Sequence, residues 1–331
     1  MSARRVGIIG TGFMGTVHAE AWQAIGEAPV AFLCRERGAD LGDLGRFGAP
    51  LYTDLDDFFS AVDVVDICAP THVHAELALA AARAGKPTLC EKPLSLSVAE
   101  GSAVLEAFER ADVPLQVGHI LRFSPEYRAA WETVSSGELG APAVLRLSRL
   151  SFAPERGPGS WFADDAKSGG IFFDLMIHDL DYARWIAGDV STVFAKSAAG
   201  GAGHGTAILR HESGALSHVE ASWAQPRPVF RTLLEIAGSR GLISFSSDDT
   251  SPVAVRRHIT ASAASTGLGD IALAANPFEI EVRHFLDVVD GNARPALTAL
   301  DALKAVQLAA ATCESAQTGK PVCIRPLGGG S

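Results

Sequence analysis

The stretch Val6-Gly7-Ile8-Ile9-Gly10-Thr11-Gly12-Phe13-Met14-Gly15 carries the pattern G-x-G-x-x-G between a short apolar run and a helical pattern that continues through Trp22. In this strand–turn–helix context the pattern is typical of dinucleotide binding. Gly10 permits the tight turn, Gly12 lets the backbone approach a pyrophosphate, and Gly15 lets the helix pack on the strand. The residues predicted to bind the cofactor here are Gly10, Thr11, Gly12, Phe13, Met14 and Gly15.

Apolar runs and helical patterns then alternate as far as about residue 120. Strands are predicted at Val30–Cys34, Val62–Cys68, Thr88–Pro93 and Pro114–Gly118, with helices near Val73–Ala84 and Ser97–Ala111. Strands separated by helical patterns of this length indicate a doubly wound parallel sheet. We therefore predict an α/β Rossmann domain over residues 1–120, which binds a dinucleotide.

The pattern changes after residue 120. Alternating runs of strand length follow at Ala143–Leu150, Ser191–Ser197, Thr206–His211, Ala215–Ser222, Thr232–Ala237 and Leu242–Ser246. Their spacing indicates a mainly antiparallel sheet, and two helices are predicted near Pro277–Asp290 and Thr298–Thr318. We predict a second, α+β domain over residues 121–327, with Ser262–Gly269 as a flexible loop and 328–331 as a flexible tail.

The bulk composition excludes several classes of protein. With 28 Lys+Arg against 38 Asp+Glu the net charge is −10, which argues against a nucleic-acid-binding or anionic-membrane-binding surface. No apolar run reaches the roughly 18 residues of a membrane span, and no signal-peptide pattern opens the sequence. The five cysteines are odd in number and far apart, so we expect reduced thiols and a cytoplasmic protein.

The run Thr88–Pro93 ends in Glu91-Lys92-Pro93, two opposite charges followed by a residue that cannot donate a backbone hydrogen bond. Ligands of open α/β sheets bind outside the carboxyl ends of the strands. We therefore predict that Lys92 lies where a cofactor site meets a substrate site. The alternative is a lysine on a surface loop.

The choice between NAD and NADP depends on the residues after the second strand. NAD-preferring sites usually place an acid there, whereas this chain has Arg35-Glu36-Arg37. Guanidinium groups suit a 2′-phosphate, so the sequence predicts an NAD(P) site that favours NADP through Arg35. The alternative is that both arginines are solvated.

A turn after the third predicted strand adds further cofactor contacts. It reads Ala69-Pro70-Thr71-His72-Val73-His74, and Ala69, Pro70, Thr71 and His74 are predicted to contact the cofactor. Two histidines two residues apart point in different directions on a helix, and neither Cys nor carboxylate nearby completes a ligand set. No metal site is predicted.

A third group of candidates lies on the helical stretch Ser168–Tyr182. Asp174, His178 and Asp181 have the spacing i, i+4, i+7 and share one helical face, while apolar residues cover most of the rest. A buried helix with a polar stripe is expected to turn that stripe toward a cavity, and histidine exchanges a proton near neutral pH. The alternative is a structural Asp–His pair that caps a neighbouring loop.

These motifs together resemble the Gfo/Idh/MocA family of sugar and cyclitol oxidoreductases. The resemblance runs nearly end to end: Gly10-x-Gly12-x-x-Gly15-x-x-His18-Ala19, Pro70-Thr71-x-x-His74, Glu91-Lys92-Pro93, Gly118-x-x-x-Arg122-Phe123, Gly169-Gly170-x-x-x-Asp174-x-x-x-His178-Asp179, and Ser315-x-x-x-Gly319-Lys320-Pro321. It implies that Lys92, Asp174 and His178 are catalytic. It also implies that the second domain is an open-faced sheet forming the substrate pocket and the interface of a homodimer or homotetramer.

The implied reaction is hydride transfer between nicotinamide and a secondary alcohol of a sugar, cyclitol or glycoside. His178 would be the base, Lys92 would bind the reacting oxygen, Glu91 would orient Lys92, and Asp174 would hold a hydroxyl or the imidazole. The other residues implied to line the substrate pocket are His119, Arg122, Trp161 and Tyr127. The pair Trp161-Phe162 stands where relatives often have a base after Trp, which suggests a less polar pocket.

Two other activities remain open at this point. One is a glycosidase or lyase that oxidises its substrate transiently with bound NAD and returns the cofactor unchanged. The other is a non-catalytic NAD(P)-binding regulator. A regulator would be expected to lose Lys92 or His178, and both are present.

Overall fold

A computed structural model describes residues 4–34, 41–154, 160–198, 203–248, 254–257 and 276–327. The chain forms two compact units. The first comprises Met1–Phe123, Ala166–Ser168 and Ala275–Val306, and the second comprises Ser124–Asp165, Gly169–Ala274 and Gln307–Ser331. The first run of the first unit ends close to the boundary predicted near residue 120. The return of 275–306 to that unit was not anticipated from the sequence.

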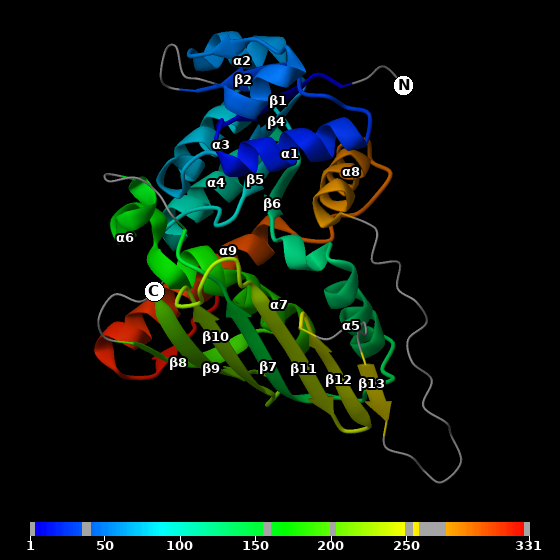
Figure 1. The fold of residues 1–331 in the computed structure, drawn as a ribbon, viewed down its shortest axis with the longest axis vertical. Helices are drawn as coiled ribbons and strands as arrows, with labels where there is room; N and C mark the ends of the chain where they lie inside the picture. Colours follow the sequence, from blue (N-terminus) through cyan, green and yellow to red (C-terminus); the bar gives the residue numbers. More distant parts are fainter. Residues whose placement is uncertain are drawn as a thin grey trace. The chain divides into compact units, whose positions relative to one another are not determined.

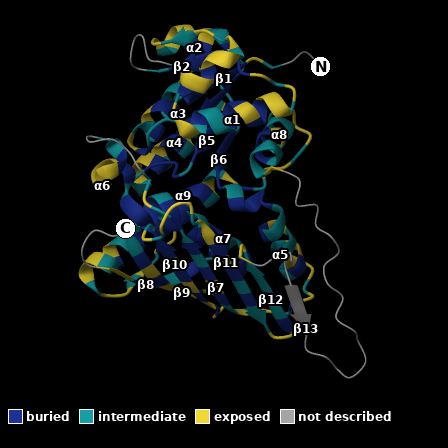
Figure 2. Cartoon of the chain, in the orientation of Figure 1, coloured by how far each residue is buried: buried dark blue, intermediate teal, exposed yellow. Residues whose placement is uncertain are grey.

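Among the described residues of the first unit, six strands form a parallel sheet (Figure 1). Their order in the sheet is β3 (Leu51–Tyr52), β2 (Ala31–Leu33), β1 (Val6–Ile9), β4 (Val64–Ile67), β5 (Thr88–Glu91) and β6 (Leu115–Gly118). Every residue of β1, β4, β5 and β6 is buried, as expected for a parallel sheet covered on both faces (Figure 2). The predicted Rossmann sheet is confirmed.

α-Helices connect these strands, and all but the one at Leu55–Ala61 were predicted from the sequence. They are α1 (Phe13–Ala24), α2 (Leu55–Ala61), α3 (His74–Arg83) and α4 (Val98–Ala111), with a short 3-10 helix at Gly42–Phe47. Ser97 caps α4: its Oγ accepts the Glu100 N–H at 3.2 Å and donates to the Glu100 carboxylate at 2.9 Å. This reciprocal cap matches the helix start predicted from the sequence.

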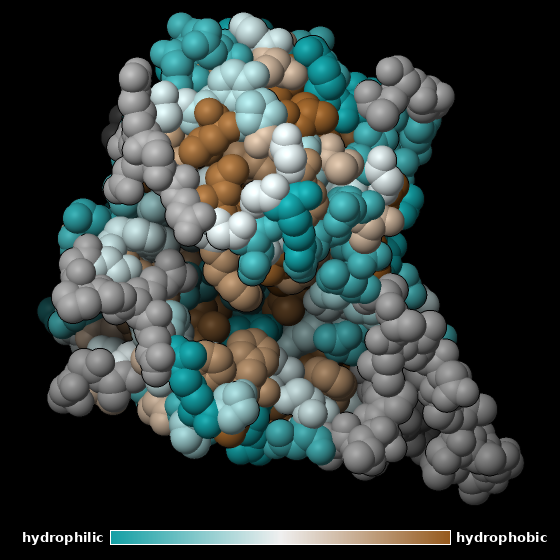
Figure 3. All heavy atoms as spheres, turned by 45° about the horizontal axis from the view of Figure 1, so that its top comes forward, coloured by the Kyte–Doolittle hydropathy of each residue, from teal (hydrophilic) through white to brown (hydrophobic). Residues whose placement is uncertain are grey.

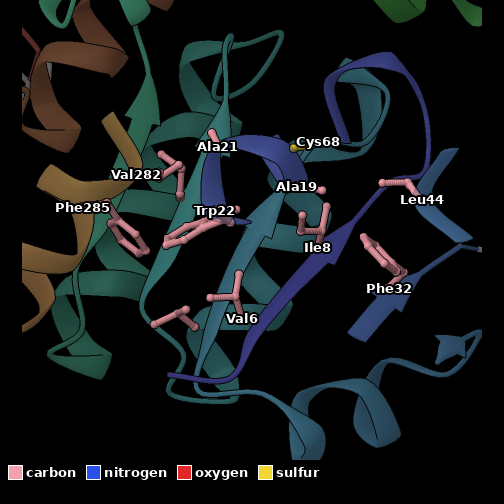
Figure 4. Close-up of a cluster of buried hydrophobic side chains, with 12 residues drawn as sticks. Val6, Ile8, Ala19, Ala21, Trp22, Phe32, Leu44, Cys68, Val282 and Phe285 are labelled. Carbon is pink, nitrogen blue, oxygen red and sulfur yellow. The ribbon is translucent and has the colours of Figure 1, made fainter. Parts of the chain in front are cut away.

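Helix α8 (Pro277–Val289) comes from the carboxyl-terminal part of the chain but packs on α1 of the first unit. Val282 and Phe285 of α8 join Trp22 and Ala21 of α1 in one buried hydrophobic cluster (Figure 4). The rings of Trp22 and Phe285 meet edge to face at 6.3 Å. The core of this unit therefore depends on a segment more than 250 residues away in sequence.

The second unit is built on a mixed, mainly antiparallel sheet of eight described strands (Figure 1). Their order is β13 (Ala254–Arg257), β12 (Gly241–Ser246), β11 (Arg231–Gly238), β7 (Pro142–Leu150), β10 (Leu216–Ser222), β9 (His204–His211), β8 (Val190–Ser197) and β14 (Val322–Cys323). Only β7 and β10 pair in parallel among these strands. The helices of this part of the chain are α5 (Pro125–Ser135), α6 (Asp165–Ser168), α7 (Ile177–Ala187) and α9 (Ala299–Thr318), and the boundary between the units falls within α9.

Buried and more exposed residues alternate along the strands of this sheet, whose cartoon is banded in dark blue, teal and yellow in Figure 2. Leu145, Leu147 and Arg149 of β7 share one face and are buried, and α7 packs on β7 and β10. On the opposite face Ile208, Leu216 and Leu233 are 40–43 % exposed. These outward side chains belong to β9, β10 and β11, three strands of the same sheet.

All five cysteines lie within the described residues and are free thiols, with Cys68 and Cys90 buried and Cys323 exposed. Within the described ranges, no helix is long and apolar enough to cross a membrane. Hydrophobic residues, in brown, lie among hydrophilic residues, in teal, on the face that Figure 3 shows.

Candidate active site

The three glycines of the first turn differ in what a side chain would meet at each position. Gly10 has φ +112°, and a Cβ there would lie 2.5 Å from the backbone oxygen of Cys68 at the end of β4. A Cβ on Gly15 would lie 2.2 Å from the oxygen of Gly10, so α1 can approach the turn only without one. A Cβ on Gly12 would meet no heavy atom within 4 Å. The space in front of α1 therefore suits a pyrophosphate held by the amino end of the helix.

No side chain of α1 caps the backbone N–H groups at its amino end. Gly12 is its N-cap and makes no side-chain capping bond, and the first turn contains no acidic residue. Phe13 is 76 % exposed beside it, while Thr11 and Met14 are half-buried. Free backbone N–H groups at a helix amino end favour an anionic group such as a diphosphate.

The carboxyl ends of β5 and β6 place Lys92 and His119 next to each other in the sheet order. Glu91 is paired with Gly118, and Lys92 and His119 are the first residues after these two strands. Lys92 is half-buried and His119 is 1 % exposed. The parallel register thus brings these two predicted site residues to the same edge of the sheet as the turn after β1.

Below this edge lies a buried polar cluster. The His18 ring of α1 has Nδ1 at 2.8 Å from Asp66 Oδ2 and Nε2 at 3.0 Å from Glu91 Oε1. The other Glu91 oxygen accepts the backbone N–H of Lys92 at 3.0 Å. This contact supports the expected role of Glu91 in orienting Lys92.

His74, which is predicted to contact the cofactor, has both ring nitrogens engaged with backbone oxygens. It is 1 % exposed, with Nδ1 at 2.7 Å from the oxygen of Pro93 and Nε2 at 2.7 Å from the oxygen of Ala69. Burial lowers the pKa of the ring, against the effect of these two carbonyls. His74 therefore ties the turn after β4 to the turn after β5.

In the second unit, the helix that carries Asp174 and His178 begins with a π-helical segment, Phe172–Met176, which continues into α7. From Ile171 to Ala183, all described, every residue is buried except Asp174 and His178, which are half-buried. The expectation of a buried helix with a polar exposed stripe is therefore met at these two positions. π-helical turns are rare and occur often at functional sites.

Asp181 differs from its expectation, since it is 1 % exposed and so does not share the open part of the stripe. The predicted common face assumed a regular α-helix, and the π-helical turn is wider than an α-helical one.

The neighbour of His178 anchors this helix to the sheet. Asp179 is fully buried and receives two hydrogen bonds from Arg149 of β7, Nε to Oδ2 at 2.7 Å and Nη2 to Oδ1 at 3.2 Å. Burial alone would lower the pKa of Arg149, but the Asp179 carboxylate raises it above its ordinary value. Tyr127, predicted as a pocket residue, accepts a 3.3 Å hydrogen bond from Arg149 and is 2 % exposed, so in this structure it supports that ion pair.

The remaining predicted residues have mixed placements. Arg35 lies outside the described residues, as does the loop Ser262–Gly269. Arg122 is 2 % exposed and donates to the oxygen of Ala296 at 3.1 Å, a contact within the first unit. Trp161 opens a short 3-10 helix, Trp161–Ala163, and its ring contacts Phe162 at 5.6 Å. The Arg122 contact is structural, so its predicted role toward substrate has no support from this geometry.

Sequence reasoning gave no role to several residues of the buried clusters, among them His18, Asp66, Trp22, Arg149, Asp179 and Glu281. Two signals were available. Asp66 interrupts the apolar strand Val64–Ile67, and His18 stands one turn beyond the third glycine of the fingerprint. A carboxylate in a buried strand requires a partner, which the structure supplies as His18.

Comparison with known families agrees with this geometry. Residues 4–119 match the oxidoreductase family with an NAD-binding Rossmann fold, and residues 127–244 match the GFO/IDH/MocA C-terminal domain. The chain belongs to the Gfo/Idh/MocA family. As a member it is an NAD-binding oxidoreductase, and the resemblance inferred from its motifs is confirmed.

Several proteins named as dehydrogenases are similar to this chain over most of their length. The chain is 33% identical over 337 residues to D-apiose dehydrogenase of Paraburkholderia graminis, covering 97% of this chain and 89% of that one. It is 35% identical over 255 residues to myo-inositol 2-dehydrogenase of Thermotoga maritima, covering 72% and 74%. A solved levoglucosan dehydrogenase in complex with NADH and levoglucosan has a TM-score of 0.86 at 25% identity, covering 98% of this chain and 100% of that one.

Proposed function

We propose that this member of the family is an NAD(P)-dependent dehydrogenase that transfers a hydride between nicotinamide and a secondary alcohol of a sugar, cyclitol or glycoside. The observation that carries the proposal is the pair Asp174 and His178, the two positions left open on a helix that is otherwise buried from Ile171 to Ala183. The similar proteins are named for apiose, inositol and levoglucosan, which are polyhydroxylated compounds.

The proposed roles of the side chains follow from their chemistry. The nicotinamide, when bound, supplies the site that accepts or donates the hydride. His178 takes the hydroxyl proton as the carbinol carbon is oxidised, because imidazole gains and loses a proton near neutral pH. The Lys92 ammonium donates to the same oxygen and stabilises the negative charge that develops on it. Asp174 holds an adjacent hydroxyl or the imidazole.

The test is a screen of reduced-cofactor absorbance with D-apiose, myo-inositol, scyllo-inositol, levoglucosan and common hexoses, each with NAD⁺ and NADP⁺. We expect turnover with at least one of these compounds, accompanied by stoichiometric formation of reduced cofactor. A substrate that is consumed while the cofactor spectrum returns unchanged would instead indicate the lyase or glycosidase activity. Absence of turnover with every class would contradict the proposal.

The cofactor preference is a separate proposal. Arg35 and Arg37 after β2 supply guanidinium groups that suit a 2′-phosphate, so we expect NADPH to bind more tightly than NADH. Fluorescence titration of both cofactors is the measurement, and Arg35→Asp is expected to reverse the preference by supplying an acceptor for the ribose hydroxyl. Tighter NADH binding by the unmodified protein would overturn the inference.

We also propose a homodimer or homotetramer formed through the outward face of the second sheet. Ile208, Leu216 and Leu233 are exposed on neighbouring parts of this face. Exposed apolar side chains on one sheet face are typical of an interface between identical subunits.

A further inference from the structure

A buried imidazole lies between two carboxylates in the first unit. His18 is fully buried, and each of its ring nitrogens lies within hydrogen-bond distance of a carboxylate oxygen, Asp66 Oδ2 at 2.8 Å and Glu91 Oε1 at 3.0 Å. A carboxylate can only accept, so both bonds form when the ring carries protons on both nitrogens. Burial alone would lower the pKa of His18, but Asp66 and its neighbours raise it well above its ordinary value. The ring is therefore an imidazolium held by two anions.

Asp66 is itself held by two further donors. Trp22, one turn after His18 on α1, donates its indole N–H to Asp66 Oδ2 at 2.7 Å. The thiol of Cys68 donates to Asp66 Oδ1 at 3.5 Å. Because both oxygens are engaged and the residue is fully buried, Asp66 gives the imidazolium one orientation.

The other end of the cluster reaches the residue that the proposed chemistry uses. Glu91 holds His18 through Oε1 and accepts the backbone N–H of Lys92 through Oε2, at 3.0 Å each. Burial opposes ionisation of Glu91, but the bond from His18 outweighs it and lowers the pKa of the carboxyl. The chain Trp22–Asp66–His18–Glu91 thus ends on the peptide from which the Lys92 side chain leaves β5.

The residue after Lys92 is held in the same way. The His74 ring contacts the oxygen of Pro93 at 2.7 Å. Lys92 is half-buried, whereas its two chain neighbours are buried. The backbone is therefore restrained before and after Lys92, and His18 acts only on the first of these restraints.

A metal site is the competing interpretation of the same residues. One ligand atom each of His18, Asp66 and Cys68 lies within 4.8 Å of the others. However, an ion would have to displace a proton from His18 and break its bond to Asp66. Burial also raises the pKa of the Cys68 thiol far above its ordinary value, so the thiolate that a metal requires is disfavoured. Hydrogen bonding accounts for every one of these contacts.

We propose that His18 is a positioning residue for Lys92: by clamping Glu91 against Asp66 it sets the direction in which the Lys92 side chain leaves the sheet. The proposal rests on the proposed function, because the direction of Lys92 matters only if Lys92 acts in the hydride-transfer step. The other ionisable groups around His18 are Cys68 and Cys90 at the ends of β4 and β5 and Glu281 of α8. The Glu281 carboxyl oxygens have no hydrogen-bond partner among the described residues, so they do not compete for the imidazolium.

The decisive variant is His18→Gln, which removes the charge and one of the two donors. We expect kcat to fall about 10- to 100-fold because the reacting oxygen meets a misdirected ammonium. The KM for the sugar and the Kd for NADH are expected to stay within about twofold, since neither site loses a contact. The position of the Lys92 side chain is followed by NMR in apoprotein whose lysines carry isotope-labelled methyl groups. The Lys92 signal is assigned by its loss in Lys92→Arg. In His18→Gln this signal is expected to shift or broaden relative to wild type.

The matched control is His211→Gln in the second unit. His211 is 1 % exposed, and its ring nitrogens lie 2.7 Å from the oxygen of Gly188 and 2.7 Å from Ser217 Oγ, so its loss removes a buried histidine with two contacts of similar length. We expect a comparable loss in Tm with kcat and the Lys92 signal unchanged. A fall in kcat that simply tracks Tm in both variants would overturn the proposal.

A milder variant covers the case in which His18→Gln does not fold. Trp22→Phe keeps an aromatic ring against Phe285 but deletes the N–H that fixes Asp66, and a smaller shift of the Lys92 signal in the same direction is expected. An unchanged Lys92 signal in both His18→Gln and Trp22→Phe would refute the positioning role. The signal is read without substrate, so a wild-type protein that turns over no sugar would contradict the proposed function while leaving this test in force.

Discussion

The Nε of Arg149 lies 2.7 Å from Oδ2 of Asp179, the residue that follows His178. Both side chains are buried, and two nitrogens of the guanidinium donate to the two carboxylate oxygens. The pair joins β7 to α7, so it holds the helix that presents His178 against the sheet. Arginine suits this place because its planar fork matches the two carboxylate oxygens.

Arg149→Met is expected to destabilise the protein by about 3–5 kcal/mol, because it leaves the buried Asp179 carboxylate without its counter-charge. The double variant Arg149→Met/Asp179→Leu is expected to recover much of that loss. The control is Arg146→Met on the same strand, whose partner Glu235 is partly exposed, with an expected effect within about 1 kcal/mol. Denaturant unfolding measures all three, and similar losses for Arg149→Met and Arg146→Met would contradict a special role for the buried pair.

The fingerprint glycines are expected to respond in opposite ways. Gly12→Ala adds a Cβ that meets no protein atom within 4 Å, so Tm is expected to stay unchanged while NADH affinity falls about tenfold or more. Gly15→Ala places a Cβ 2.2 Å from the oxygen of Gly10 and is expected to cost about 1–3 kcal/mol of stability. Thermal melts and cofactor titrations separate the two effects. Equal affinity of wild type and Gly12→Ala would argue against pyrophosphate binding at this turn.

The proposed catalytic residues are tested by Lys92→Ala and His178→Ala. Each is expected to lower kcat by about 10²- to 10⁴-fold, the usual contribution of a positioned acid–base or charge-stabilising group. The control for Lys92 is Lys86→Ala. Lys86 lies two residues before the start of β5, at the end remote from Lys92, and donates to the oxygen of Val62. Near-normal kcat in either test variant, with an identified substrate, would remove that residue from the catalytic group.

Stability is expected to depend on pH through Glu281. Burial raises its pKa well above the ordinary value of 4.5, and although His18 opposes this effect, Glu91 and Asp66 reinforce it. In the folded protein Glu281 therefore keeps its proton at pH values above 4.5, where the unfolded chain has released it. This contribution to stability is complete below pH 4.5 and is lost as pH rises toward the folded pKa.

Glu281→Gln is accordingly expected to stabilise the protein relative to wild type, with a difference that grows by up to about 1.4 kcal/mol per pH unit as the pH rises from the ordinary value of 4.5 toward the folded pKa. Glu279→Gln, on the same helix but not buried, is the control and should leave the pH dependence unchanged. Melting curves across this range provide the measurement. A difference that is constant with pH would show that Glu281 is ionised in the folded protein.

The proposed assembly is tested on the outward sheet face. Ile208→Lys and Leu233→Lys each place a charge at a residue on this face that is exposed, 43 % for Ile208 and 40 % for Leu233. If the face is covered by a second copy, the desolvated lysine is expected to shift the molecular mass measured by light scattering toward the monomer. Leu300→Lys, at an exposed position on α9 outside the sheet, is the control. An unchanged oligomer in both sheet variants would place the interface elsewhere.

Local patterns in the sequence determined much of the fold. The glycine spacing after Val6–Ile9 and the alternation of strands and helices predicted the parallel sheet, since these signals depend on neighbours in the chain. The polar stripe with Asp174 and His178 was visible for the same reason, because a buried helix leaves few positions for charged residues.

Tertiary structure alone decided how those residues are supported. Helix α8 completes the first core from the far end of the chain, and Asp66, His18 and Glu91 come from three elements that meet only in the folded sheet. The π-helical turn before α7 likewise replaces the regular spacing that the sequence suggested. Pairing of buried charges depends on which side chains the fold brings within hydrogen-bond distance, and no local pattern in the sequence encodes that distance.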